Sequence, residues 1–301
     1  MQHKDVTGHL LLVFTVLIWG STFISTKVLL AAFTPVEILF TRFIIALPAL
    51  WLVYPRPLRG TTLRQESTMA AAGLCGICLY YLLENIALTH TTASNVGVII
   101  STSPFFTALL SRLLMRGEER LSINFFAGFV LAITGISLMS FHGGEPRLNL
   151  TGDLLALLAA FVWACYSLLV KKISTYGHHS IASTRRIFAY GILFMLPVIG
   201  TAGFSPSAEQ LLRPLCLANL LYLGLGASAA CFATWSIAVK LLGTVRASIY
   251  IYLIPVITVW GAVIFLREQI TPAAGLGMAL TVAGVILSGK RPRTRSTAPA
   301  A

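Results

Sequence analysis

A carboxylate buried inside a long apolar run is the feature of this sequence with the clearest chemical meaning. Glu84 lies well inside such a run, whereas Glu37 and Asp153 lie where two other runs begin. An ionised carboxylate among apolar side chains costs free energy unless it is paired or hydrated. We therefore expect Glu84 to face a cavity, where it binds a cationic or amino-bearing solute or carries a coupling proton. A structural carboxyl, bonded to a neighbouring hydroxyl or to helix backbone, is the alternative.

Aromatic side chains accompany this carboxylate. Tyr80 and Tyr81 precede Glu84 by four and three residues, so in a helix they share its face. An acid beside phenols makes a pocket with one charge, apolar walls and hydrogen-bonding tips, unless the tyrosines face a lipid interface instead. Aromatics on other apolar runs suit a planar or amphipathic solute, or they simply fill space between helices. These further candidates are Trp19, Trp163, Tyr166, Trp235, Tyr250 and Tyr252.

Four polar or helix-breaking residues in the apolar runs each allow two interpretations. Asn95 opens one run, where its amide either binds substrate or caps a helix. Pro104 and Pro255 each remove a helix hydrogen bond, and form either hinges or fixed kinks. Arg42 is expected to extend its charge toward the membrane surface or to pair with a carboxylate.

The elements that must position these residues are membrane-spanning helices. Of the 301 residues, 56% are hydrophobic and 11% charged, and the mean hydropathy is +0.83. Soluble domains carry roughly 25% charged residues. The first apolar run is too long for a signal peptide, so we expect it to remain as a spanning helix. The sequence predicts an all-α membrane protein of ten transmembrane helices, at about 9–31, 36–54, 68–88, 93–115, 122–141, 152–171, 181–203, 215–239, 245–266 and 271–289.

The basic residues indicate how these helices cross the membrane. The net charge is +12, and most of the 22 Lys and Arg residues fall in the gaps on one side of the ten-helix arrangement. Basic loops face the cytoplasm, so we expect both termini there and the chain in the inner membrane. The same pattern argues against a nucleic-acid partner, because the charge marks topology rather than a solvated basic face.

The chain also repeats itself. Similar residues recur at offsets of about 144 to 151 in the same order: Trp19 and Lys27 with Trp163 and Lys171, Pro104 and Arg116 with Pro255 and Arg267, Gly128 and Gly135 with Gly277 and Gly284. Two five-helix halves follow, over residues 1–145 and 146–301. Because five is odd, the second half enters from the opposite side, which is an inverted repeat with a substrate site between the halves. The paired glycines indicate close packing of the halves or of a dimer.

The order of these motifs resembles a known family. The chain is similar to EamA-type members of the drug/metabolite transporter superfamily over roughly residues 9–289. The resemblance is carried by Trp19-Gly20-Ser21-Thr22-Phe23, Arg42-Phe43, Ala93-Ser94-Asn95, Ser103-Pro104-Phe105-Phe106-Thr107-Ala108-Leu109, Gly117-Glu118, Leu253-Ile254-Pro255-Val256 and Arg267-Glu268. The resemblance implies ten helices in inverted halves and export of amino acids, related metabolites or drugs. The second half departs from the pattern, with Ala164-Cys165-Tyr166 where the first has Gly20-Ser21-Thr22.

Together these features predict a secondary transporter. We expect it to export a small metabolite, an amino acid or related amphipathic or aromatic compound, or a drug, by alternating access. A channel-like facilitator and a membrane-embedded transferase are the alternatives. No phosphate-binding loop, catalytic triad or metal-ligand cluster stands out, so we expect no enzyme activity, cofactor or metal. The expected partners are a small-molecule substrate, membrane lipid and, as one candidate, a coupling proton, with the chain as monomer or homodimer.

Overall fold

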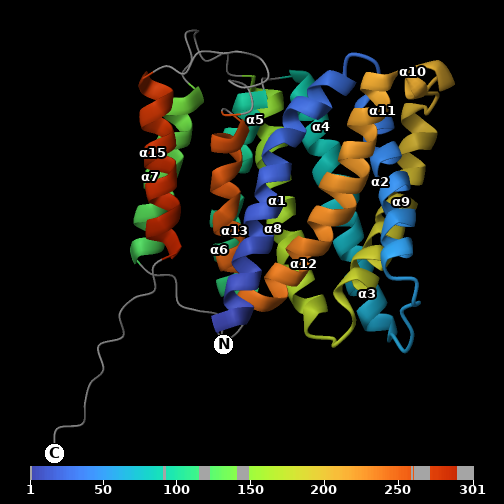
Figure 1. Ribbon diagram of the computed structural model, residues 1–301, viewed down its shortest axis with the longest axis horizontal. Coiled ribbons are helices and arrows are strands. Elements are labelled where there is room, and N and C mark those ends of the chain that lie inside the picture. Colours follow the sequence, from blue (N-terminus) through green and yellow to red (C-terminus); the bar gives the residue numbers. More distant parts are fainter. Residues whose placement is uncertain are drawn as a thin grey trace, which may run out of the picture.

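A computed structural model describes residues 2–90, 93–114, 123–140, 149–258, 260 and 272–289, and every regular element in this part is a helix (Figure 1). The first half of the chain contains α1 (Gln2–Leu29), α2 (Pro35–Val53), α3 (Leu63–Gly73), the π-helical η1 (Leu74–Leu79), α4 (Tyr80–His90), α5 (Ala93–Ile100), α6 (Ser103–Leu114) and α7 (Ile123–Ser140). The second contains α8 (Leu150–Ser174), α9 (Ser180–Ala202), α10 (Ala208–Leu212), α11 (Pro214–Leu221), the π-helical η2 (Tyr222–Ala230), α12 (Cys231–Leu242), α13 (Thr244–Ile249), the 3₁₀ turn η3 (Tyr250–Leu253) and α15 (Pro272–Gly289).

Capping residues between the helices explain where several of the helices begin. Thr34 caps α2: its side chain accepts from the backbone N–H of Glu37, whose carboxylate accepts from the N–H of Thr34. Thr62 and Gln65 form the same reciprocal box at the start of α3. Each box satisfies two helix N–H groups that have no partner within the helix.

The described helices confirm a protein that crosses the membrane several times. Six helices are long and apolar enough to span a bilayer: Asp5–Leu29, Pro35–Val53, Leu63–His90, Leu150–Ser174, Ser180–Ala202 and Pro214–Leu242. They coincide with six of the expected segments. In the described residues the other four expected segments, 93–115, 122–141, 245–266 and 271–289, fall on shorter or interrupted helices.

Two antiparallel contacts between distant parts of the chain build the centre of the molecule. The first joins α1 to the helix formed by α11, η2 and α12. There, the Ser25 hydroxyl donates to Asn219 Oδ1 at 2.6 Å, and Trp19 Nε1 donates to the Ala227 carbonyl at 3.0 Å. The second joins α8 to the helix formed by α3, η1 and α4, where Tyr176 OH donates to Thr68 at 3.0 Å. These contacts place both π-helical segments in the middle of the bundle.

The helices α7 and α15 pack together at one side of the molecule (Figure 1). The predicted glycines lie in their contact. A Cβ added at Gly128 would meet Ser288 and the Gly284 carbonyl, and one at Gly135 would meet the Gly277 carbonyl and Thr281. The glycines therefore pack the two halves of one chain against each other, and this surface is not free for a dimer contact.

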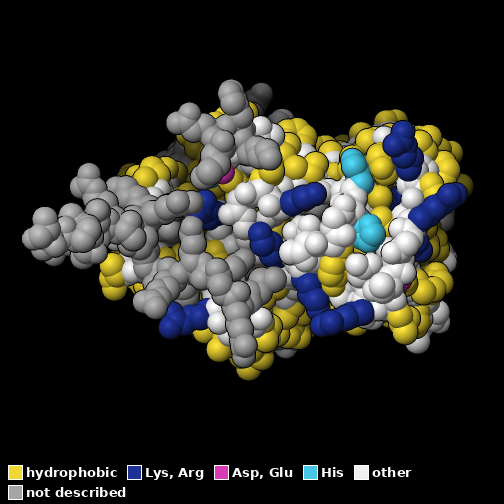
Figure 2. All heavy atoms as spheres, turned by 90° about the horizontal axis from the view of Figure 1, so that it is seen from below, with side chains coloured by type: hydrophobic (Ala, Val, Ile, Leu, Met, Phe, Trp, Pro, Cys, Tyr) yellow, Lys and Arg dark blue, Asp and Glu magenta, His cyan; other side chains and the backbone are white. Residues whose placement is uncertain are grey.

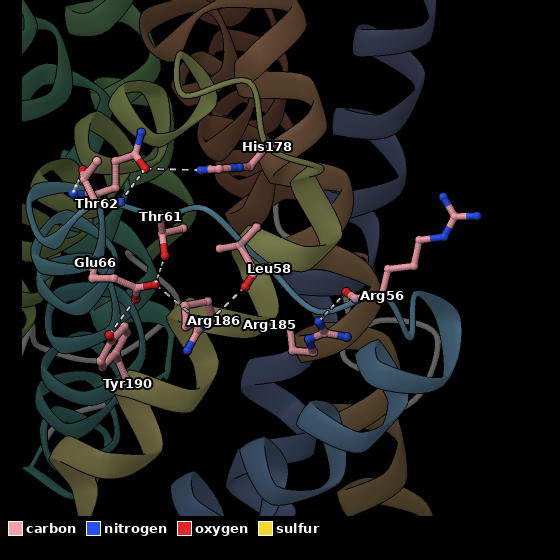
Figure 3. Close-up of polar contacts among 10 residues, drawn as sticks. Arg56, Leu58, Thr61, Thr62, Glu66, His178, Arg185, Arg186 and Tyr190 are labelled. Carbon is pink, nitrogen blue, oxygen red and sulfur yellow. Dashed lines mark hydrogen bonds and ion pairs between the residues drawn. The ribbon is translucent and has the colours of Figure 1, made fainter.

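The end of the molecule that carries the N-terminus is rich in basic side chains. Figure 2 shows Lys and Arg spread over this end, with histidines among them. A polar cluster holds the connection 54–62 there (Figure 3). Glu66 accepts from Tyr190 OH at 2.6 Å and pairs with Arg186 Nε at 3.7 Å, and Arg185 donates to two backbone carbonyls of the connection at 2.6 and 2.7 Å. This cluster ties α3 to α9 at what we call the Lys/Arg end.

Candidate functional site

A cavity lies between the two central helix contacts. It has a volume of about 420 Å³, with the solvent at its mouth included. Its walls come from α1, α4, α8, the break between α5 and α6, and the chain around η3. The side chains that line it are Trp19, Thr22, Phe23, Tyr80, Tyr81, Glu84, Ile100, Ser103, Trp163, Ile251 and Ile254. We call this space the Glu84 cavity.

The structure brings together five of the predicted site residues in this cavity. Glu84 is only 4% exposed, and Tyr80 and Tyr81, one turn earlier on the same helix, line the same wall. Trp19 and Trp163 also line the cavity; their ring centres are 5.1 Å apart in an edge-to-face contact, and the ring centre of Trp163 lies 4.9 Å from that of Tyr80. The arrangement is a carboxylate set among aromatic faces, which suits a positively charged group on an otherwise apolar solute.

A second layer of aromatic rings lies behind the lining. Trp235 is fully buried, with its ring centre 5.3 Å from that of Trp19 and 5.6 Å from that of Trp163. Tyr166 is also fully buried, and its ring centre lies 5.1 Å from that of Trp163. Both predicted residues therefore support the lining from behind and do not themselves line the cavity.

Two other predicted residues lie away from the cavity. Tyr250 lies next to His9, with its hydroxyl 2.7 Å from His9 Nδ1. Tyr252 is fully buried in a separate cluster with Phe129 of α7. Both tyrosines belong to the 3₁₀ turn η3, which has three residues per turn. With this repeat Ile251 and Ile254 face the cavity, and the two tyrosines point away from it. The side chain of Asn95 lies outside the described residues.

The prolines mark helix interruptions rather than kinks in continuous helices. The helix α5 ends at Ile100 and α6 begins at Ser103, so Pro104 lies in the first turn of a new helix. Pro255 lies in the same place after η3, in the helical stretch 254–258. A proline in the first turn of a helix costs no hydrogen bond. Both interruptions contribute to the cavity wall.

The prediction that Arg42 extends toward the membrane surface was wrong. The residue is 1% exposed, and its Nε donates to Ser228 Oγ in η2 at 2.9 Å. Its guanidinium carbon lies 4.3 Å from the ring centre of Tyr81. Tyr81 lines the Glu84 cavity, so Arg42 places a buried cation directly behind the cavity wall. Among the described side chains, no ion pair joins Arg42 to Glu84.

Several lining residues carry no signal for chemistry in the sequence. Thr22 and Phe23 belong to the motif around Trp19, and Ser103 precedes the repeated proline, so proximity to these motifs was the available signal. Ile100, Ile251 and Ile254 are ordinary apolar residues. In the described part of the chain, no group of three His, Cys, Asp or Glu side chains could hold a metal ion.

Several apolar helices long enough to span a bilayer, packed around a cavity with a buried carboxylate and aromatic walls, are typical of multi-pass membrane transporters. A family model described as "EamA-like transporter family" matches residues 6–141 and again residues 150–289. The chain therefore belongs to the EamA-like transporter family.

Several similar proteins carry names that describe them as transporters or exporters. An "Uncharacterized transporter" of Archaeoglobus fulgidus is 32% identical, with 93% of this chain and 96% of the relative covered. A "Probable terminal-alkyne amino-acid exporter" of Streptantibioticus cattleyicolor is 29% identical over 93% and 92%. A "Probable amino-acid metabolite efflux pump" of Salmonella typhimurium is 26% identical over 99% of each chain. A solved crystal structure has the same fold, with a TM-score of 0.76 at 19% identity over 96% of each chain.

Proposed function

We propose that this protein exports a small amphipathic metabolite that carries an amino group, across the cytoplasmic membrane, by alternating access. The observation that carries the proposal is the buried carboxylate of Glu84 in a cavity walled by Trp19, Trp163, Tyr80 and Tyr81. The names of two relatives, an amino-acid exporter and an amino-acid metabolite efflux pump, agree with a solute of this kind.

The proposed architecture is ten transmembrane helices in two inverted halves, 1–145 and 146–301, with both termini in the cytoplasm. The two successive family matches support this division. The accumulation of Lys and Arg at the end that carries the N-terminus supports the orientation. The site then lies between the halves near the middle of the membrane, as in other inverted-repeat transporters.

In this proposal the lining residues divide the recognition of the solute. The Glu84 carboxylate receives the ammonium group, and the tryptophan faces add cation–π attraction and apolar contact. The hydroxyls of Thr22 and Ser103, which also line the cavity, bind further polar groups of the solute. When the solute leaves, a proton or water occupies the carboxylate, so a proton gradient is one source of drive and the solute gradient is the other.

The proposal is tested by comparing Glu84→Gln with Glu37→Gln in proteoliposomes. Both glutamates are buried, at 4% and 8% exposure, but Glu37 serves as the reciprocal cap of α2. Glutamine keeps the cap of α2 and loses only the acceptor for the Ser205 N–H at 3.2 Å, which lies away from the cavity, so Glu37→Gln should transport as the unchanged protein does.

The measurement is efflux of a panel of radiolabelled amino acids and aromatic amines preloaded into the vesicles. A lost charge-assisted hydrogen bond is worth about 1.5–3 kcal/mol, which lowers affinity roughly 10- to 100-fold. We expect Glu84→Gln to lose efflux by this factor at low solute concentration. Efflux at the unchanged rate from a Glu84→Gln protein that elutes normally would refute the assignment. Stimulation of efflux by the same solute outside the vesicle distinguishes a carrier from a channel.

A further inference from the structure

A second pocket lies close to the Lys/Arg end, between α8, α9 and α12, and has a volume of about 280 Å³. Ser174, His178 and Ser180 form its half-exposed rim, and Ser183, Thr184 and Ser236 form its buried floor. Polar groups thus continue from the solvent-facing rim into the bundle, which is unusual for an interior lined otherwise by apolar side chains. We call this space the serine pocket.

We propose that the serine pocket is an entry site for the exported solute, and that Trp163, Tyr166 and Ser236 form the barrier between it and the Glu84 cavity. This inference rests on the proposed export function. It adds a second binding site for the solute and identifies the side chains between which the solute passes.

The two spaces are separated by a short chain of side chains. Trp163 lines the Glu84 cavity and contacts Tyr166, whose ring centre is 5.1 Å away. The Tyr166 hydroxyl faces Ser236 without reaching hydrogen-bond geometry. Ser236 lines the serine pocket and has its Oγ 3.1 Å from that of Thr184. Two rings and a hydroxyl therefore close the route in this conformation.

Two polar atoms of the barrier have no partner. Among the described atoms, Trp163 Nε1 and Tyr166 OH are buried without a hydrogen-bond partner. A buried unpaired group of this kind costs about 1–3 kcal/mol. A permanently closed core gains nothing from such groups, whereas a route that admits solute and water in another conformation satisfies them. The location of these atoms between the two spaces is thus what a closed gate predicts.

The packing around the Tyr166 ring also agrees with a ring that moves when the gate opens. Its ring packs directly on Gly76 in the π-helical η1, and a Cβ at position 76 would collide with the ring. The π-helical hydrogen-bond pattern is a rare one that recurs at functional sites. A change in η1 toward regular α-helix would shift Gly76 and release the ring.

The serine pocket suits the polar head of the same solute. Hydroxyl oxygens accept from an ammonium group and hydroxyl protons are donated to a carboxylate, so both ends of an amino acid find partners there. The His178 ring lies at the rim, with Nε2 3.4 Å from Gln65 Oε1. The pocket contains no acidic lining residue, so it holds the solute more weakly than the Glu84 cavity and releases it inward.

The test is cysteine accessibility, which needs no knowledge of the solute. Ser183→Cys places a thiol in the serine pocket, and Ser103→Cys places one in the Glu84 cavity. Ser167→Cys is the matched control, because Ser167 is fully buried and lines neither of these two pockets. Each variant is treated with methanethiosulfonate ethyltrimethylammonium in right-side-out and in inverted vesicles. Labelling of the unchanged protein measures the background from its own cysteines.

We expect Ser183→Cys to react from one side of the membrane, Ser103→Cys from the other, and Ser167→Cys from neither. Adding Tyr166→Ala should let the reagent reach Ser103→Cys from the side of Ser183, at least tenfold faster than before. Tyr166→Leu, which keeps more of the buried volume, serves if the alanine variant does not fold.

Three results would overturn the proposal: Ser183→Cys unreactive from both sides, Ser183→Cys and Ser103→Cys reactive from the same side, or a folded Tyr166 variant without faster labelling. These outcomes are independent of the efflux assay. Failure of Glu84→Gln to change efflux refutes the proposed substrate role, whereas the labelling pattern refutes or supports the route.

Discussion

Removal of the buried charge of Arg42 should destabilise the protein more than removal of any exposed arginine. The substitution Arg42→Met keeps a long side chain of similar reach and eliminates the cation. It abolishes the 2.9 Å hydrogen bond to Ser228 and the cation–π contact with Tyr81 at 4.3 Å. It also removes the cation that lies behind Tyr81 in the wall of the Glu84 cavity.

The magnitude follows from these contacts. A hydrogen bond with a charged donor contributes about 1.5–3 kcal/mol, and a desolvated cation over an aromatic face about 2 kcal/mol. Relief of the buried cation's own desolvation offsets part of this sum. The hydrogen bond and the cation–π contact together contribute about 3.5–5 kcal/mol, so after this offset we expect a loss of about 3 kcal/mol.

The assay is unfolding of purified protein in mixed micelles by increasing dodecyl sulfate, followed by tryptophan fluorescence. Arg213→Met is the matched control. Its ion pair with Glu209, at 3.0 Å, has side chains that are 57% and 82% exposed, and such pairs contribute about 0–1 kcal/mol. The control should therefore unfold close to the unchanged protein.

A double variant tests whether the two buried charges interact. Arg42→Met with Glu84→Gln has neither charge, so its loss should be smaller than the sum of the two single losses by about 1–3 kcal/mol. Additive losses would show that Arg42 does not balance Glu84. A single variant Arg42→Met as stable as Arg213→Met would refute the whole account of the buried cation.

Two further predictions concern packing away from the cavity. Gly135→Ala should destabilise the protein by about 1–3 kcal/mol, because the added Cβ meets the backbone of α15; Gly200→Ala, in open space on α9, should be neutral or stabilising in the same unfolding assay. Equal effects at both positions would contradict the close packing of α7 on α15. Glu66→Gln should lose about 1–2 kcal/mol, because the bond from Tyr190 OH at 2.6 Å no longer ends on a charged oxygen. Hydrogen exchange in segment 54–62 measures whether this end loosens, and unchanged exchange would contradict it.

The features predicted best from sequence were those with strong local causes. Length and hydropathy located the six long apolar helices, because a bilayer requires about 20 apolar residues whatever the packing. Glu84 and its two tyrosines were placed on one face by the helical repeat alone. Trp19 and Trp163, which the sequence repeat pairs, lie in contact in the structure, with ring centres 5.1 Å apart.

The features that sequence did not reveal depend on contacts between distant helices. Arg42 near a helix end looks like a surface residue until Ser228 and Tyr81, 186 and 39 residues away, are seen to enclose it. The directions of Tyr250 and Tyr252 depend on a 3₁₀ turn, because a regular helix of the same residues would point them elsewhere. Such tertiary constraints leave no periodic signal in the chain.

The two π-helical segments, η1 and η2, relate the sequence repeat to the proposed transport route. Gly73, just before η1, packs on the backbone of α9, and Gly224 in η2 packs on α2; the two glycines are 151 residues apart, the offset of the repeated prolines. Each π-helical segment or its flank thus packs on a helix from the other part of the chain, which agrees with the proposed inverted halves. The side chains received there differ, since η2 binds the charged Arg42 and η1 seats the neutral Tyr166. The two segments therefore serve different spaces. The charged Arg42 lies beside the Glu84 cavity, whereas the neutral ring of Tyr166 lies on the proposed route to the serine pocket.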